Sequence, residues 1–312
     1  MNAVICSRMF PLLIKILFLA NIFCWSAWVM SLSAAPDEAF PGYQIEVDYR
    51  ITNNGPLQGS LYFPKGIPAQ GNWPVVLFVH GGGWLGNDRS AASNWRHREV
   101  HRIILNSRVA VFAIDYRKHP VARNVGDPVS DCIAALRWIA ENGPAHRLDA
   151  GRIAIWGSSA GGHLALMAVI EATRSPGSGT PVPRRVAAWY PATRLDWILE
   201  DAPQDSRKRI RGLGFNPKQN NQLNYAYSPL EQVEWLRLPT LLIHGENDPL
   251  FFPRHSEALH WELQKRSRAS SLIIVRNGVH GFATSPGDEG IRPSLQIIQQ
   301  QTADFLALVA SD

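Results

Sequence analysis

Cysteine is scarce in this chain of 312 residues, which contains only three. Cys6 and Cys24 lie within the first 35 residues, so Cys132 is the one cysteine beyond them. A single cysteine cannot form a disulfide within the chain, which excludes a disulfide-stapled scaffold. The sequence also has no C-x-x-C pair and no His/Cys spacing typical of zinc sites, so we expect neither a metal nor an organic cofactor.

Charged residues are also few, at 18% of the chain against 46% hydrophobic residues. This composition excludes disorder over most of the chain, and the length allows a large buried core. The net charge of +5 falls to +3 without the first 35 residues, whose only charges are the cations Arg8 and Lys15. The one basic cluster, residues 207–211, has no interleaved aromatic residue, so we expect a solvated face and no nucleic-acid partner.

Acidic residues are absent before Asp37, and an apolar run covers residues 16–30. The run is followed by Ser33-Ala34-Ala35, which has the form of a secretory signal peptide cleaved near Ala35. The alternative is an uncleaved membrane anchor over residues 11–30. We therefore expect export to the periplasm or the medium, with membrane association only if the leader is retained.

Beyond the leader, short apolar runs alternate with helix-length segments, and no repeat or linker divides the chain. This alternation predicts an α/β fold whose mainly parallel central sheet is flanked by helices, in a single domain over residues 36–312. Residues 192–230 interrupt the rhythm and are expected to form a small cap-like insertion. An antiparallel edge pair is expected in YQIEVDYR and GSLYFP. The expected parallel strands lie at 73–80, 108–117, 152–157, 185–190, 238–245 and 271–277, and helices at 127–143, 256–267 and 292–309.

A cluster of small residues, Gly157-Ser158-Ser159-Ala160-Gly161, separates a short apolar run from a long one. It matches G-x-S-x-G, in which a strand turns sharply into a helix and small neighbours permit their close approach. The turn presents the hydroxyl of Ser159, and the backbone N–H of Ala160 at the helix start can face an oxyanion. Ser159 is therefore the candidate nucleophile, and an ordinary Gly/Ser loop or a nucleotide-binding turn is the alternative.

A second glycine-rich segment, HGGGWLGNDR at residues 80–89, follows a buried strand directly. Consecutive glycines are entropically costly, and they fit a loop whose backbone amides must reach a ligand. The amides of Gly82 and Gly83 are the expected donors for the rest of the oxyanion hole. His80 is expected to brace this loop, and Trp84 to line the substrate pocket or to pack in the core.

A serine nucleophile needs a base, and the base needs an acid that orients it. Asp248 follows one apolar run in LLIHGENDPL, and His280 follows the next in IIVRNGVHGF. The order Ser159, Asp248, His280 is the order in which such a triad follows a strand-turn-helix nucleophile. Asp248 as a turn residue, His280 as a surface loop residue, and Glu246 or Asp288 as the acid are the alternatives.

With these motifs in view, the chain resembles the α/β-hydrolase superfamily, and within it the hormone-sensitive-lipase-like and feruloyl-esterase-like serine esterases. The matching pieces are HGGGW, DYR, GRIAIWGSSAGGHLAL and HGENDPL, within residues 43–310. The resemblance implies that Ser159 is the nucleophile, His280 the general base and acid, and Asp248 its orienting partner. The segment DYRKHP departs from the family pattern at Lys118-His119, and the N-terminal cap is short, which puts the shape of the acyl pocket in doubt.

The predicted function is hydrolysis of carboxylic esters through an acyl-enzyme, on short-acyl or carbohydrate-linked esters. Two other classes remain open: an exported serine peptidase of the same fold, and a non-catalytic binding module on a hydrolase scaffold.

Overall fold

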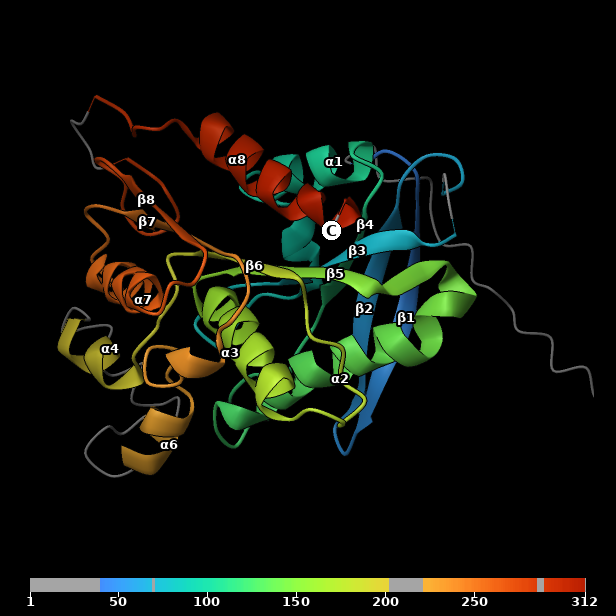
Figure 1. Ribbon diagram of the computed structural model, residues 1–312, viewed down its shortest axis with the longest axis horizontal. Helices are drawn as coiled ribbons and strands as arrows, with labels where there is room; N and C mark the ends of the chain where they lie inside the picture. The colour runs from blue at the N-terminus through green and yellow to red at the C-terminus, as the bar shows by residue number, and fades with distance from the viewer. Residues whose placement is uncertain (1–39, 69–70, 202–220, 285–288, 312) are drawn as a thin grey trace, which may run out of the picture. The chain divides into compact units, whose positions relative to one another are not determined.

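The computed structural model describes residues 40–68, 71–201, 221–284 and 289–311 (Figure 1). The expected leader, residues 1–35, lies outside the described residues, so its form and its cleavage stay predictions. Residues Pro36–Asp312 form one compact unit. Within the described ranges, no helix combines the length and the apolar character needed to cross a membrane.

An eight-stranded sheet forms the centre of this unit, in the order β1-β2-β4-β3-β5-β6-β7-β8. The two pairings that involve β2 are antiparallel, and all the others are parallel. The strands are β1 (Tyr43–Thr52), β2 (Gly55–Phe63), β3 (Trp73–Val79), β4 (Ala110–Ile114), β5 (Leu148–Ser158), β6 (Arg185–Trp189), β7 (Thr240–Gly245) and β8 (Ser270–Val275). The sheet therefore has an antiparallel edge and a parallel body, as the sequence pattern predicts.

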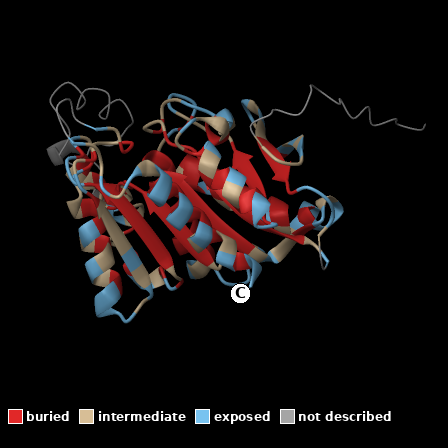
Figure 2. Ribbon diagram, turned by 90° about the horizontal axis from the view of Figure 1, so that it is seen from above, coloured by how far each residue is buried: buried red, intermediate tan, exposed pale blue. Residues whose placement is uncertain are grey.

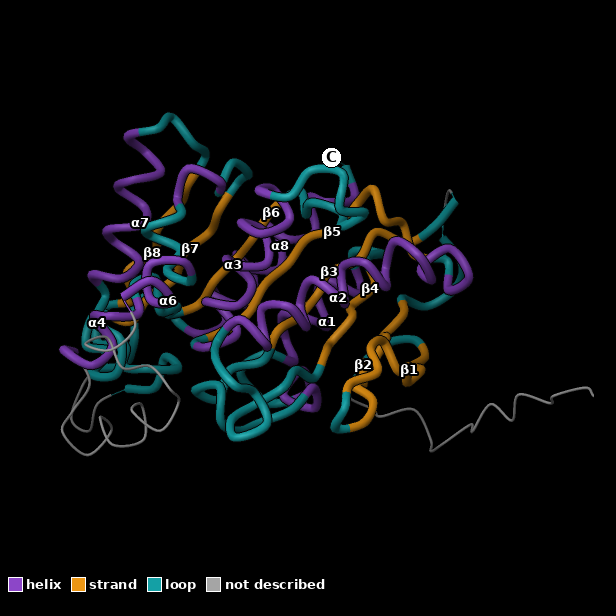
Figure 3. The backbone as a smooth tube through the Cα atoms, turned by 90° about the horizontal axis from the view of Figure 1, so that it is seen from below, coloured by secondary structure: helices purple, strands orange, loops and turns teal. Residues whose placement is uncertain are grey.

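Helices cover both faces of the sheet, with α1 and α8 on one side and α2, α3 and α7 on the other (Figure 1). The α-helices are α1 (Arg98–Asn106), α2 (Gly126–Asn142), α3 (Ala160–Arg174), α4 (Leu195–Asp201), α6 (Asn221–Ala226), α7 (Arg254–Lys265) and α8 (Leu295–Ala307). Short 3-10 helices occupy Arg89–Ser93, Gly143–His146, Val233–Trp235 and Leu308–Ala310. Figure 3 shows α2 and α3 lying along the strands. Because helices pack on both faces of the sheet, β3 and β4 are buried on both sides, which accounts for their nearly continuous apolar runs.

Alternate residues of β3 enter two separate cores. Val75, Leu77 and Val79 pack with α2 and α3, whereas Val76 and Phe78 pack with α1 and α8. This division follows from the period of two along a strand. Figure 2 shows the result, a buried sheet under helices whose outer faces are exposed. The expected α/β fold class, a mainly parallel sheet flanked by helices, is confirmed.

The carboxyl ends of the parallel strands lie level with one another. The residue pairs Val79–Gly157, Ser158–Trp189 and Gly245–Val275 are in register across the sheet. The loops that follow these strands therefore emerge along one edge, which is where open α/β sheets place their ligands. Of the expected insertion at 192–230, the structure describes α4 and α6. Residues 202–220 lie outside the described ranges, so its role as a cap stays a prediction.

Candidate active site

Ser159 occupies the turn between β5 and α3, in an unusual backbone conformation with φ 57° and ψ −123°. Such strain in a non-glycine residue is found mainly where function requires it. A Cβ on Gly157 would lie 2.4 Å from the Gly161 carbonyl oxygen, and one on Gly161 would lie 2.0 Å from that of Val79. The glycines therefore allow β5, α3 and the end of β3 to meet behind a serine whose exposure is 7%.

The structure brings Ser159, Asp248 and His280 together, although they lie on three separate loops. Nε2 of His280 is 3.0 Å from the Ser159 hydroxyl, and Nδ1 of His280 is 2.7 Å from a carboxylate oxygen of Asp248. Asp248 has a fully buried side chain, whereas that of His280 is 23% exposed. The three side chains thus form one continuous hydrogen-bonded chain that a small molecule can approach from the histidine side.

Asp248 is held as a carboxylate by the groups around it. Burial alone raises the pKa of Asp248, but hydrogen bonds from His244 and His280 outweigh burial and hold that pKa well below its ordinary value. Its Oδ1 accepts the backbone N–H groups of Leu250 and Phe251 at 2.8 and 3.1 Å. Since a carboxylate can only accept, Nδ1 of His280 donates to Asp248, and Nε2 is the atom that faces the Ser159 hydroxyl.

The other candidate acids do not share this contact. Glu246 lies on the same loop as Asp248, and its Oε2 accepts the backbone N–H of Asn277 at 3.1 Å. Asp288 lies outside the described residues. Among the acids that the structure describes, Asp248 is the one hydrogen-bonded to His280.

The glycine-rich loop packs directly against the Ser159 turn. A Cβ on Gly81 would lie 2.8 Å from the carbonyl oxygen of Ser158, and one on Gly82 would lie 2.3 Å from that of Gly86. Gly82 has φ +121°, and its carbonyl closes the loop by accepting the N–H groups of Leu85 and Gly86 at 3.1 Å each. Within the described ranges, the amides of Gly82 and Gly83 donate to no backbone carbonyl. Ala160 opens α3, so its N–H has no partner one turn back in the helix.

His80 and Trp84 flank these glycines and are both buried. Nδ1 of His80 contacts the Gly81 carbonyl at 2.7 Å, and its ring stacks on Tyr116 at 4.3 Å. Burial lowers the pKa of His80 to about 4, so it is neutral near pH 7 and suited to bracing the loop. The ring of Trp84 lies 5.3 Å from His163 and 6.4 Å from Phe251. Trp84 is thus packed in the core, and its contact with a substrate stays a prediction.

Ser158 and His97 form a buried pair behind the nucleophile that the sequence does not predict. The hydroxyl of Ser158 lies 3.1 Å from Nε2 of His97, whose Nδ1 contacts the Ala91 carbonyl at 2.9 Å. Tyr190 places its ring 4.6 Å from that of His280, and burial raises the pKa of the Tyr190 hydroxyl to about 12. His97 precedes a helix far upstream in the sequence, and no local motif signals that it reaches the Ser159 turn.

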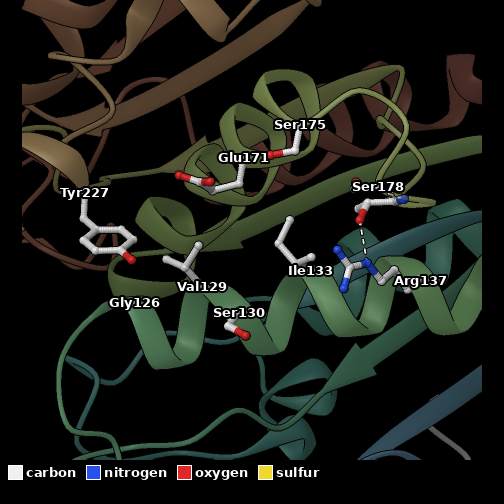
Figure 4. Close-up of a pocket in the computed structure, with 10 residues that line it drawn as sticks. Gly126, Val129, Ser130, Ile133, Arg137, Glu171, Ser175, Ser178 and Tyr227 are labelled. Carbon is white, nitrogen blue, oxygen red and sulfur yellow. Dashed lines mark hydrogen bonds between the residues drawn. The ribbon is translucent and has the colours of Figure 1, made fainter.

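Two hollows occur in the described part of the chain, one away from the reactive side chains and one lined in part by Asp248. One of about 230 Å³ lies between α2 and α3, where Tyr227, Glu171 and Arg137 contribute to its wall (Figure 4). Nε of Arg137 donates to the Thr180 hydroxyl there at 2.8 Å. The other, of about 580 Å³, borders the Asp248 loop and is lined in part by Phe252 and Glu257. No cluster of three or more His, Cys, Asp or Glu residues suited to a metal occurs in the described part of the chain.

Curated relatives include two proteins of Mycobacterium tuberculosis. The chain is 33% identical over 155 residues to a protein named Esterase LipI, covering 49% of this chain and 45% of the relative. It is also 33% identical over 226 residues to Carboxylesterase NlhH, covering 68% of this chain and 63% of the relative. The chain therefore spans less than two thirds of the length of either relative.

Solved structures confirm the α/β-hydrolase fold. Esterase Est2 of Thermogutta terrifontis superposes with a TM-score of 0.66 at 22% identity, covering 88% of this chain and 94% of that one. A truncated carbohydrate esterase from gut microbiota gives 0.70 at 18% identity, covering 89% and 100%. LAE6, described as an α/β-hydrolase enzyme from the metagenome of Lake Arreo, gives 0.68 at 23% identity, covering 89% and 86%. At these identities the likeness establishes the fold.

Membership of a family rests on a different comparison. The model of the BD-FAE family matches residues 60–263, about two thirds of the chain, and the match includes the glycine-rich loop, the Ser159 turn and Asp248. His280 follows the matched range, on the loop after β8. The esterase resemblance expected from the motifs is thereby confirmed, and the protein belongs to the BD-FAE family.

Proposed function

We propose that this protein is a serine carboxylesterase that hydrolyses esters through an acyl-enzyme formed on Ser159. The observation that carries the proposal is the chain of hydrogen bonds from Ser159 to His280 at 3.0 Å and from His280 to Asp248 at 2.7 Å. The printed names of the curated relatives, an esterase and a carboxylesterase, support the same reaction class. Family membership alone would not, because one fold hosts many functions.

The reaction begins when the Ser159 oxygen attacks the ester carbonyl carbon and the hydroxyl proton passes to Nε2 of His280. The bond from the carbonyl carbon to the alcohol oxygen then breaks, and His280 returns the proton to the leaving alcohol. Water attacks the acyl group on Ser159 and gives a proton to His280. As the bond to Ser159 breaks, this proton restores the hydroxyl and the carboxylic acid departs. The Asp248 carboxylate stabilises the imidazolium at each step without taking up a proton.

The oxyanion formed in each half-reaction is assigned to the amides of Gly82, Gly83 and Ala160. Two observations support this assignment: the glycine loop is packed against the Ser159 turn, and the amides of Gly82 and Gly83 donate to no backbone carbonyl within the described residues. Ala160 adds the positive end of the α3 dipole. Removing one such donor lowers turnover by roughly 10²- to 10³-fold in serine hydrolases of this type.

The substrates we propose are short-acyl esters or esters linked to carbohydrate. Trp84 and Phe251 are buried beside the site, with the ring of Phe251 5.4 Å from that of His280, and we propose that these bulky rings favour a short acyl group. A structural neighbour is named as a carbohydrate esterase, which supports the second group of substrates. Export through the leader remains part of this proposal, since a periplasmic or secreted enzyme would meet such esters outside the cell. No metal or cofactor takes part in the steps proposed.

The test is hydrolysis of p-nitrophenyl esters, from acetate to palmitate, by the full chain and by Ser159→Ala. We expect activity that is highest on short acyl groups and lost by more than 10³-fold in Ser159→Ala. Ser175→Ala, at the far end of α3, is the matched control and should retain full activity. A fluorophosphonate should lose fluoride to form one phosphonate ester, which peptide mass spectrometry should locate on Ser159.

Several results would overturn the proposal. Full activity in Ser159→Ala would exclude Ser159 as the nucleophile. A folded chain that takes up no phosphonate and cleaves no ester would point to a binding module. Labelling of Ser159 with cleavage of peptides but not esters would point to a peptidase.

A further inference from the structure

His244 is a second histidine beside the acid, and it is fully buried near the carboxyl end of β7. Its Nδ1 lies 2.7 Å from the hydroxyl of Ser256, a buried residue of α7. Its Nε2 lies 2.8 Å from the carbonyl oxygen of Phe251 and 3.4 Å from Oδ2 of Asp248. Both ring nitrogens therefore have partners, although the reaction proposed above does not use this residue.

The partners define the protonation of the ring. A carbonyl oxygen can only accept, so Nε2 of His244 carries a proton and donates it to Phe251. Nδ1 is assigned as the acceptor of the Ser256 hydroxyl, 2.7 Å away. The same Nε2–H also faces the Asp248 carboxylate at longer range, which adds to the positive potential around that acid. Ser256 thus selects the tautomer that presents a donor to the acid loop.

Phe251 connects His244 to the reactive side chains. Its N–H donates to Oδ1 of Asp248 at 3.1 Å, its carbonyl accepts from His244, and its ring meets that of His280 edge-on at 5.4 Å. Fixing the Phe251 backbone therefore restrains the direction of the Asp248 carboxylate and one face of the His280 ring together. Pro249, which lies between Asp248 and Phe251 in the sequence, has no N–H and so cannot donate a hydrogen bond to the Asp248 carboxylate.

We propose that His244 is a positioning residue that, through Phe251, holds the Asp248–His280 pair in line with Ser159. The proposal rests on the function proposed above and adds a residue that neither the G-x-S-x-G motif nor the triad order singles out. His244 touches no substrate and moves no proton in the reaction. Its contribution is to keep the acid and the base within the narrow range of geometry that proton transfer requires, where a displacement of about 1 Å costs on the order of 10²-fold in rate.

Two substitutions of His244 by residues with an amide side chain distinguish a positioning role from general support of the fold. In His244→Gln the amide nitrogen reaches the place of Nε2 and can still donate to Phe251. In His244→Asn the amide reaches only the place of Nδ1, so it keeps Ser256 and loses Phe251. His101→Asn is the matched control, because His101 is equally buried and also uses both nitrogens, with the Ala92 carbonyl at 2.9 Å and Trp156 at 3.2 Å.

We expect all three variants to melt below the wild type, because each disturbs a buried hydrogen-bonded ring. On a short p-nitrophenyl ester, kcat should fall about 100-fold in His244→Asn with KM within threefold of the wild type. It should stay within about tenfold in His244→Gln and within twofold in His101→Asn. Equal kcat in His244→Asn and the wild type would overturn the proposal, and so would equal losses in all three variants, which would reduce His244 to fold support.

Nuclear magnetic resonance of the ring nitrogens gives a readout that does not depend on turnover. Full chain labelled with nitrogen-15 in histidine should show His244 protonated at Nε2 and unprotonated at Nδ1 at pH 7. The low-field proton on Nδ1 of His280, bonded to Asp248, should persist in His244→Gln and be lost or shifted in His244→Asn. If the wild type cleaves no ester, the proposed function fails, and this nuclear magnetic resonance measurement alone tests the role of His244. The inference is overturned if the low-field proton of His280 is unaffected in His244→Asn, or if His244 has the opposite tautomer.

Discussion

Replacing Asp248 with Asn is the sharpest test of the site, because it removes a charge and leaves the shape almost unchanged. The carboxylate accepts from two backbone amides through Oδ1 and from His280 through Oδ2. In Asp248→Asn the amide oxygen will keep the two backbone donors, since turning it away would leave Leu250 and Phe251 without a partner. The amide nitrogen, a donor, must then face Nδ1 of His280.

Two donors facing each other force His280 into its other tautomer. The proton moves to Nε2, so Nε2 can no longer accept the proton of Ser159 from 3.0 Å away. In a triad of this kind, the wrong tautomer lowers kcat by about 10⁴-fold. At about 1.36 kcal/mol per tenfold change, the loss corresponds to about 5.4 kcal/mol of barrier.

The assay is kcat on a short p-nitrophenyl ester at pH 7 to 8, with the residual rate of Ser159→Ala subtracted. Glu246→Gln is the matched control, because Glu246 lies on the same loop and bonds only the backbone of Asn277 through the oxygen described. We expect Glu246→Gln to stay within twofold of the wild type. An Asp248→Asn enzyme within tenfold of the wild type, or an equal loss in Glu246→Gln, would refute the assignment of the acid.

Two further predictions concern stability. In Gly161→Ala the new methyl would lie 2.0 Å from the Val79 carbonyl oxygen, so we expect about 1–3 kcal/mol of destabilisation in guanidinium unfolding. Gly86→Ala, where a Cβ would meet nothing within 4 Å, should unfold like the wild type, and equal midpoints for all three proteins would contradict the packing argument. The unfolding free energy should also fall as the pH drops from about 6.5 toward 4, because burial lowers the pKa of four histidines and only the unfolded chain takes up their protons in that window. The pKa values fall to about 4, 4, 3 and 4 for His80, His97, His101 and His163. The pKa of Asp248 is lowered in the fold, so its carboxylate contributes to stability at pH values above its ordinary pKa of 3.8 and loses this contribution only below that pH. Between about pH 4.5 and 7 the change in stability should therefore come from the histidines, and a flat profile in this range would count against neutral buried histidines.

The alternation of elements and the residues that carry the chemistry can be predicted from the amino-acid sequence. Buried parallel strands need continuous apolar runs, and a strand that turns into a helix over a serine needs glycines on both sides, so both features are local and readable. The expected strands are present with bounds that differ by a few residues, as in β4 at Ala110–Ile114 for the run at 108–117. The helices α1, α4 and α6 lack so clear a pattern, and no helix was expected at these positions.

Which side chains meet depends on the tertiary structure. The sequence favours Asp248 as the acid and keeps Glu246 as an alternative, and the loop conformation turns Asp248 toward His280 and Glu246 toward Asn277. Likewise, no local pattern assigns a partner to His97 or His244, and it is the fold that brings one behind Ser158 and the other behind Asp248. The physical reason is that hydrogen bonds of about 3 Å depend on the relative placement of elements far apart in the chain, and no local pattern encodes that placement.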